Sequence, residues 1–208
     1  MIDNFLRPAG TRGQVVADAV RFLGVLSVVL ALAVSGVTDA AIVAFCTPGL
    51  MLPRFLGMRP GADAAVCVVL LVAAWSNVLD LYRAVWWWDI PVHVATAGAL
   101  AVMGYLVLAR RDIVAPPVSP RFTAIGAVVL TTALGLALGA LWEMVEWFGY
   151  AAITADIHVT YHDTIGDMAA GATGALLGGL LMARTPQLLI PSIAVTVTGC
   201  ESRCRHRS

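Results

Sequence analysis

The stretch YHDTIGDMAAGATGALLGGLLMA, residues 161–183, joins a histidine and two aspartates to an apolar run of helical length. Ionisable groups are costly at membrane depth, so their presence beside such a run favours a functional site. Two other stretches, WWWDIPVH at 86–93 and WEMVEW at 142–147, have the same form. These two stretches and residues 161–168 are called the three polar patches below, and each puts acids at one end of an apolar segment.

The composition is that of a membrane protein. Of the 208 residues, 60% are hydrophobic and 12% are charged, and the mean hydropathy is +0.86. Soluble chains contain about 25% charged residues, and several apolar runs here reach the length of about 20 residues that a spanning helix needs. We therefore expect an all-α polytopic helical bundle in a lipid bilayer, with no nucleic-acid partner.

Six apolar runs are long enough to cross a membrane. We expect them to form a single transmembrane domain over residues 1–185, followed by a cytosolic or interfacial tail at 186–208 that is partly disordered. The expected spans are 15–37, 40–57, 64–82, 91–109, 122–147 and 165–183. The first run also has the form of a signal peptide, so its cleavage is left open.

Prolines predict local features of two spans. Pro48, Gly49 and Pro53 interrupt the second apolar run, so a kinked or broken helix is expected there. Pro91 suits the first turn of the fourth span, where its missing N–H is no loss.

The arginines predict the orientation. All thirteen basic residues are arginines. With six spans and a cytoplasmic N-terminus, twelve of them fall in cytoplasmic segments and only Arg83 falls in an outer loop, as the positive-inside rule requires. Both termini are then cytoplasmic, and all three polar patches lie at the outer end. Trp86, Trp87 and Trp88 are expected to be interface anchors.

Helical spacing places each polar patch on one face with small residues. The three faces are Asp89, His93, Ala97, Ala101 and Gly104; Gly135, Gly139, Glu143 and Glu146; and Asp163, Asp167, Gly171, Gly174 and Gly178. Because small residues let membrane helices approach closely, we expect a tight core of three helices whose acids meet in an outward-facing pocket.

The residue types in this pocket suggest cation chemistry. The candidate metal ligands are Asp89, His93, Glu143, Glu146, Asp163 and Asp167, and the candidate catalytic groups are Glu143, His93 and Asp167. Carboxylates crowded into one small space either share protons or bind a cation. One histidine with several carboxylates suits Zn, Mn, Fe or Mg, and such a metal activates water. His158 and His162 offer further imidazoles.

Helix capping is the alternative role for some of these acids. Asp89 and Asp163 are expected near helix N-termini, where a carboxylate favours the helix dipole without any ligand. Glu143 and Glu146 are expected near a helix C-terminus, where the dipole disfavours them, so capping does not explain those two.

The three polar patches together resemble the YjdF-type family of uncharacterised bacterial inner-membrane proteins. The shared pattern is Asp-x-x-x-His at 89–93, Trp-Glu-x-x-Glu at 142–146 and Asp-Thr-x-x-Asp-Met at 163–168, within residues 75–182. A looser resemblance is to VanZ-like proteins. The first resemblance implies a multi-pass protein of the bacterial inner membrane, and the second suggests a role in the cell envelope.

Three functions remain open from the sequence. The favoured one is a metal- or acid-dependent membrane enzyme that acts at the outer face on a lipid or envelope substrate. The second is a small proton- or ion-coupled transporter that uses the same carboxylates as relay groups. The third is a non-catalytic membrane assembly partner, in which the acids only hold three helices together.

Overall fold

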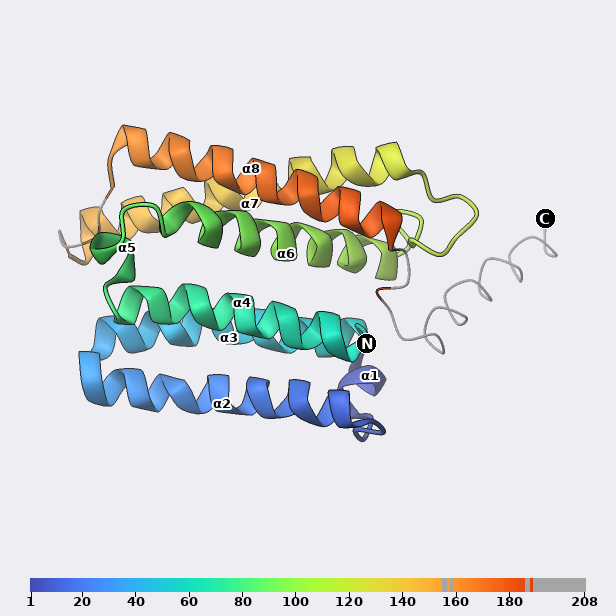
Figure 1. Cartoon of the computed structure of the whole chain (residues 1–208), viewed down its shortest axis with the longest axis horizontal. Coiled ribbons are helices and arrows are strands. Elements are labelled where there is room, and N and C mark those ends of the chain that lie inside the picture. The colour runs from blue at the N-terminus through green and yellow to red at the C-terminus, as the bar shows by residue number, and fades with distance from the viewer. Residues whose placement is uncertain (155–156, 158, 186–187, 189–208) are drawn as a thin grey trace.

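The computed structural model describes residues 1–154, 157, 159–185 and 188, which form helices and no β-strand (Figure 1). The helices are α1 (Ile2–Leu6), α2 (Arg12–Ser35), α3 (Val37–Leu56), α4 (Pro60–Val78), α5 (Leu81–Ala84), α6 (Asp89–Arg110), α7 (Ala124–Ala152) and α8 (Tyr161–Arg184). In this part of the chain, six helices are long and apolar enough to span a membrane: α2, α3, α4, α6, α7 and α8. The predicted all-α class and number of spans are therefore confirmed.

The six spanning helices form two units of three. The first unit contains α2, α3 and α4, which all pack on one another, and the second contains α6, α7 and α8, in which α6 and α7 both pack closely on α8. The short helix α5 lies in the connection between the units, and Figure 1 shows the two units as separate layers. The units meet where α3 and α4 pack on α6, around buried residues that include Leu50, Leu70 and Met103.

Small residues bring the backbones of the second unit together, as their spacing predicts. A Cβ added at Gly174 of α8 would lie 2.0 Å from the carbonyl oxygen of Val94 on α6. One added at Gly98 of α6 would lie 2.7 Å from the carbonyl oxygen of Gly174, and one at Gly135 of α7 would lie 2.2 Å from the Cβ of Ala175. Only glycine fits at such distances, so α8 packs in direct backbone contact with α6.

The helix α7 extends further than its sequence indicates. It continues to Ala152, whereas the expected span ended at residue 147. Glu143 and Glu146 therefore lie inside the helix, not in its last turn. The helix dipole acts within the last turn, so it does not disfavour these two glutamates, and the expected dipole penalty is wrong. Their environment is set by the neighbouring residues of α6 and α8.

The helix α3 is continuous, so the expected break is absent, and a kink at its prolines stays a prediction. Pro48 and Pro53 both lie inside it. Proline lacks the N–H that would bond to the carbonyl four residues earlier. For Pro48 that carbonyl belongs to Ala44, and the hydroxyl of Thr47 donates to it at 2.8 Å. A local side-chain hydrogen bond thus satisfies the freed backbone group, so the helix continues. Pro91 lies in the first turn of α6, as predicted.

The described arginines separate the two ends of the molecule. The end where α2 and α4 begin is called the arginine end. It contains Arg7, Arg12, Arg21, Arg54, Arg59, Arg110, Arg111, Arg121 and Arg184. Arg83, which is part of α5, lies at the opposite end, called the acidic end, where α6 and α8 begin. This segregation agrees with the predicted one, and which end faces the cytoplasm stays a prediction.

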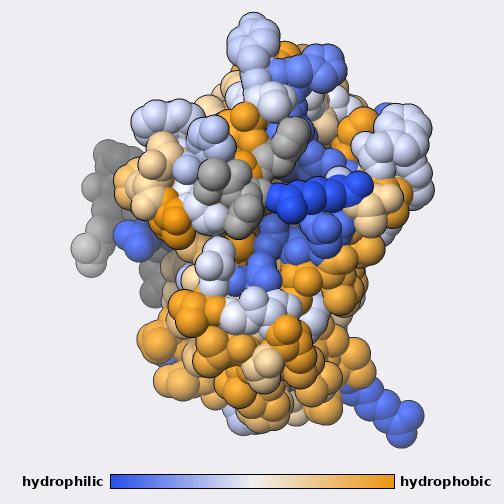
Figure 2. All heavy atoms as spheres, turned by 90° about the vertical axis from the view of Figure 1, so that its left-hand side faces the viewer, coloured by the Kyte–Doolittle hydropathy of each residue, from blue (hydrophilic) through white to orange (hydrophobic). Residues whose placement is uncertain are grey.

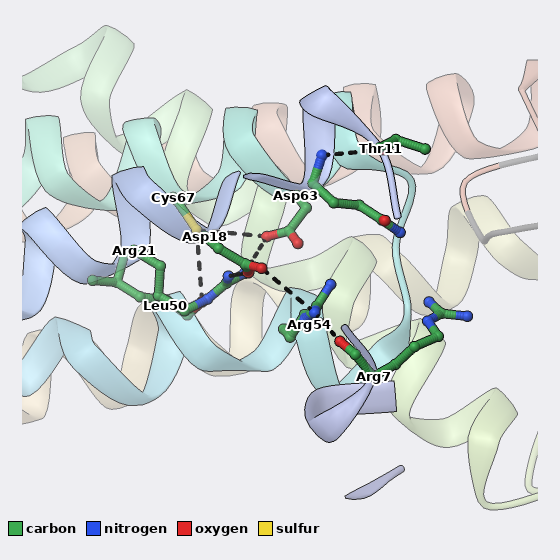
Figure 3. A network of polar contacts seen from close by, with 9 residues as sticks. Arg7, Thr11, Asp18, Arg21, Leu50, Arg54, Asp63 and Cys67 are labelled. Carbon is green, nitrogen blue, oxygen red and sulfur yellow. Dashed lines mark hydrogen bonds and ion pairs between the residues drawn. The ribbon is translucent and has the colours of Figure 1, made fainter. Parts of the chain in front are cut away.

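A buried polar network joins the three helices of the first unit at the arginine end (Figure 3). Arg21 of α2 donates from Nε to the carbonyl oxygen of Leu50 on α3 at 2.8 Å, and its other nitrogens pair with Asp18 and with Asp63 of α4. Arg54 of α3 lies 3.4 Å from Asp18. Two arginines face two aspartates, so the charges of this network balance, as buried ions require.

Candidate functional site

The three polar patches meet at the acidic end of the second unit. Asp89 is the first residue of α6, and His93 follows one turn later. Glu143 and Glu146 lie one turn apart on α7, and Asp167 lies in the second turn of α8. Viewed from this end in Figure 2, hydrophilic residues gather over the second unit, whereas the end of the first unit is mainly hydrophobic.

The first group of side chains is Asp89, His93 and Asp167, whose ligand atoms all lie within 4.8 Å of one another. Nε2 of His93 is 3.3 Å from Oδ1 of Asp89 and 3.8 Å from Oδ2 of Asp167. One ring nitrogen and two carboxyl groups thus converge on the same small volume.

The second group is Glu143, Glu146 and Asp167, again with ligand atoms within 4.8 Å of one another. Glu143 is 9% exposed and Asp167 is 8% exposed. The side chain of Thr164 on α8 is a neighbour of the Glu143 carboxylate, and Trp142 precedes Glu146 by one turn of α7. Because Asp167 belongs to both groups, the two are continuous, and α8 contributes the residue that joins α6 to α7.

The two groups carry more negative than positive charge. They contain four carboxyl groups and one histidine. The buried network at the arginine end is different, because two arginines there neutralise two aspartates. Partly buried carboxylates at this spacing need protons or a cation between them. The arrangement can therefore accept either, through oxygen and nitrogen atoms that already converge.

The remaining predicted ligands lie near the groups or outside the described residues. Asp163 is half-buried one turn before Asp167, close to Glu143 but in neither group. Its backbone N–H donates to the Thr160 hydroxyl, which caps α8. His162 is exposed in the first turn of α8 and is in neither group. His158 falls outside the described residues. The assignment of Asp163 as a ligand stays a prediction.

Tyr82 of α5 is a neighbour of the site that sequence reasoning missed. Its hydroxyl donates to the carbonyl oxygen of Ala73 at 2.9 Å. Burial, and then the nearby carboxylates of Asp89 and Glu146, raise the pKa of Tyr82. A tyrosine in a short linker beside tryptophans looks like an ordinary interface residue, so no sequence signal separates it from the aromatic belt.

The three consecutive tryptophans have different environments. Trp86 and Trp87 are exposed, as expected for interface anchors, with 87% and 48% of their surfaces accessible. Trp88 is half-buried, and its Nε1 donates to the hydroxyl of Ser76 on α4 at 2.8 Å. The interface prediction therefore suits the first two tryptophans, while Trp88 connects the second unit to the first.

A family comparison covers most of the chain, including every residue of the two groups. The family described as predicted membrane protein (DUF2238) matches residues 19–187. The chain belongs to this family. Membership in the DUF2238 family supports a multi-pass membrane protein, while the YjdF and VanZ resemblances and the bacterial inner-membrane location stay predictions. No match was found among the curated proteins or among the solved structures.

Proposed function

We propose that the protein is a membrane enzyme that binds divalent cations at its acidic end and acts on a lipid or cell-envelope substrate. The observation that carries this proposal is the pair of overlapping ligand groups that share Asp167. Helical bundles build metal sites in this way, from carboxylates and histidines that project inward from facing helices. Imidazole nitrogen and carboxylate oxygen together suit Mn, Fe, Zn or Mg.

The number of carboxylates supports up to two cations. Asp167 has two carboxylate oxygens and belongs to both groups, so it would contribute to holding a cation in either group. The four carboxylates carry four negative charges when ionised, which two divalent ions neutralise. A single divalent ion would leave two charges to be neutralised by protons.

The side chains then divide into ligands and proton-transfer groups. A bound cation supplies a water of lowered pKa and polarises an oxygen of the substrate. Glu143 is buried and its carboxylate lies within 4.8 Å of ligand atoms of Glu146 and Asp167, so we assign it as the group that accepts the proton of the attacking water. His93, whose Nε2 lies near both Asp89 and Asp167, is assigned to ligation, and the proton that Glu143 takes up would pass from Glu143 to the leaving group.

The position of the site supports an amphipathic substrate. The groups lie near the ends of three spanning helices, beside exposed aromatic side chains such as Trp86, Trp147 and Tyr161. Tryptophan and tyrosine at helix ends mark the headgroup region of a bilayer. A molecule with an apolar tail and a polar head would present its head at this depth.

Metal analysis of the purified protein tests the proposal. We expect one or two equivalents of a divalent metal per chain, and thermal stabilisation when Mn²⁺ or Zn²⁺ is added after chelation. Glu143→Ala should lower the metal content. Asp80→Asn is the matched control, because Asp80 is an exposed acid at the same end and is in neither group. Wild-type protein without stoichiometric metal and without stabilisation by either ion would contradict the proposal.

Substrate turnover is measured on the same preparations. Purified wild-type protein and Glu143→Ala are each incubated with a total membrane lipid extract, and the lipids are compared by mass spectrometry. The proposal expects a lipid species that changes with the wild type in the presence of metal and persists with the variant or after chelation.

A proton- or ion-coupled transporter is the second candidate, and the arrangement of the units favours it. Each unit has three spans, so the second crosses the membrane in the opposite sense to the first, as in many transporters built from inverted repeats. Each unit also has a buried ionisable cluster, and the two clusters lie at opposite ends. Cation flux into proteoliposomes that contain the purified protein distinguishes this function from an enzyme.

A further inference from the structure

The connection between the two units is hydrogen-bonded to α4 at two points. The Tyr82 hydroxyl donates to the carbonyl oxygen of Ala73 at 2.9 Å, and Trp88 Nε1 donates to the Ser76 hydroxyl at 2.8 Å. Ala73 and Ser76 are three residues apart, so they share a face of α4. The connection that contains α5 is therefore held against one face of α4, and its last contact, Trp88, directly precedes α6.

Ser76 is itself fixed in position. It is 1% exposed, and its hydroxyl donates to the carbonyl oxygen of Val72 at 2.7 Å. The proton of the hydroxyl is thereby committed to α4, which leaves an oxygen lone pair to accept from Trp88. The hydrogen bond consequently has a defined direction, and the indole of Trp88 has a defined orientation.

Trp88 directly precedes the first ligand of the candidate site. It is the N-cap residue of α6, and Asp89 is the first residue of that helix. A change in the orientation of Trp88 would move the backbone of Asp89, whose Oδ1 lies 3.3 Å from Nε2 of His93. Ser76 of the first unit is thus linked to the first ligand group through Trp88.

We propose that Ser76 of α4 is a positioning residue for the cation site, and that it acts through its hydrogen bond with Trp88 on Asp89 and His93. This inference rests on the proposed cation site. It assigns a role to the first unit, whose helices contribute no ligand to either group. Residues that orient metal ligands typically change metal affinity by roughly 10–100-fold when they are replaced.

The chain contains a matched control. Trp75 Nε1 donates to the Ser27 hydroxyl at 3.1 Å, and the Ser27 hydroxyl donates to the carbonyl oxygen of Gly24 at 2.8 Å. This is the same arrangement of tryptophan, serine and helix carbonyl, but it joins α4 to α2 inside the first unit. Removing it should weaken helix packing to a similar extent without reaching the site.

The test measures Mn²⁺ affinity and thermal stability of the full chain in nanodiscs. Ser76→Ala and Trp88→Phe should each weaken Mn²⁺ binding by about tenfold, and the double variant should bind no more weakly than either single one, because both lose the same hydrogen bond. Ser27→Ala should bind like the wild type. A general packing defect would weaken Mn²⁺ binding equally in Ser76→Ala and Ser27→Ala. A weaker Mn²⁺ affinity in Ser76→Ala than in Ser27→Ala therefore reports the positioning role.

The outcomes separate this inference from the proposed function. Wild-type affinity in Ser76→Ala and Trp88→Phe, with Mn²⁺ bound normally by the wild type, would overturn the positioning role and leave the cation site standing. Additive losses in the double variant would also overturn it, because the two residues would then act by different routes. Absence of Mn²⁺ binding in the wild type would overturn both the site and the inference.

Discussion

At the scale of single residues, Asp167 is the centre of the candidate site. It is the one residue shared by the two described ligand groups, and it lies opposite ligands of both α6 and α7. Its role can be chemical or structural: a carboxylate that accepts cations, or a polar group that only holds three helices together. These roles predict opposite effects of removing its charge.

Replacement of Asp167 by asparagine separates the two roles. If the carboxylate serves a cation, Asp167→Asn should fold in normal yield and lose stabilisation by Mn²⁺. Its metal-free form should be more stable by about 1 kcal/mol, because a carboxylate among carboxylates is removed; for a chain of this size that is a rise in Tm of about 2–4 °C. Thermal unfolding with and without Mn²⁺ measures the Tm of the metal-free form and its stabilisation by Mn²⁺. Loss of folded protein would instead favour the assembly partner.

At the scale of elements, the sequence predicted which faces meet but not how closely. The small-residue faces of α6, α7 and α8 follow from helical periodicity, and the convergence of Asp89, Glu143 and Asp167 follows from those faces together with the six-span topology. The contact of Gly98 with Gly174 does not, because the opposing carbonyl depends on the crossing of two helices. Gly139 was placed on a contact face, yet a Cβ there would meet nothing within 4 Å.

Tyr82 and Trp88 were missed for a related reason. Their partners, Ala73 and Ser76, belong to α4, and the packing of a linker on another unit leaves no periodic signal in the sequence. The end of α7 was misplaced because a polar WEMVEW segment resembles a membrane boundary, although the helix continues to Ala152.

Gly174 and Gly139 provide a paired test of the helix packing. Gly174→Ala places a Cβ 2.0 Å from the carbonyl oxygen of Val94, and that backbone cannot move without separating α6 from α8. Overpacking of this kind costs about 1–3 kcal/mol. Gly139→Ala has open space and should be neutral or stabilising by up to about 1 kcal/mol, since alanine favours the helix. Thermal unfolding in one detergent compares them, and equal melting temperatures would contradict the close contact.

At the scale of the whole molecule, the two ends differ in how their charges are compensated. At the arginine end, the buried Asp63 and the half-exposed Asp18 pair with arginines of the same chain. At the acidic end the two ligand groups hold four carboxylates and one histidine, with an apolar region around Leu50, Leu70 and Met103 between the ends. The ion pairs of the arginine end suit a structural role, whereas side chains that converge within ligand distance of one another suit the binding of a cation.

The orientation decides from which compartment that ligand comes. The positive-inside rule predicts that the arginine end faces the cytoplasm. In a variant without Cys46, Cys67, Cys200 and Cys204, Trp86→Cys should react with a membrane-impermeant maleimide in intact cells. Ile113→Cys should react only after permeabilisation. Both positions are exposed, at 87% and 66%, and they lie at opposite ends. The reverse pattern would place Asp89, His93 and Asp167 in the cytoplasm, so an envelope substrate would be excluded while a cytoplasmic-leaflet lipid would remain compatible with the same ligand groups.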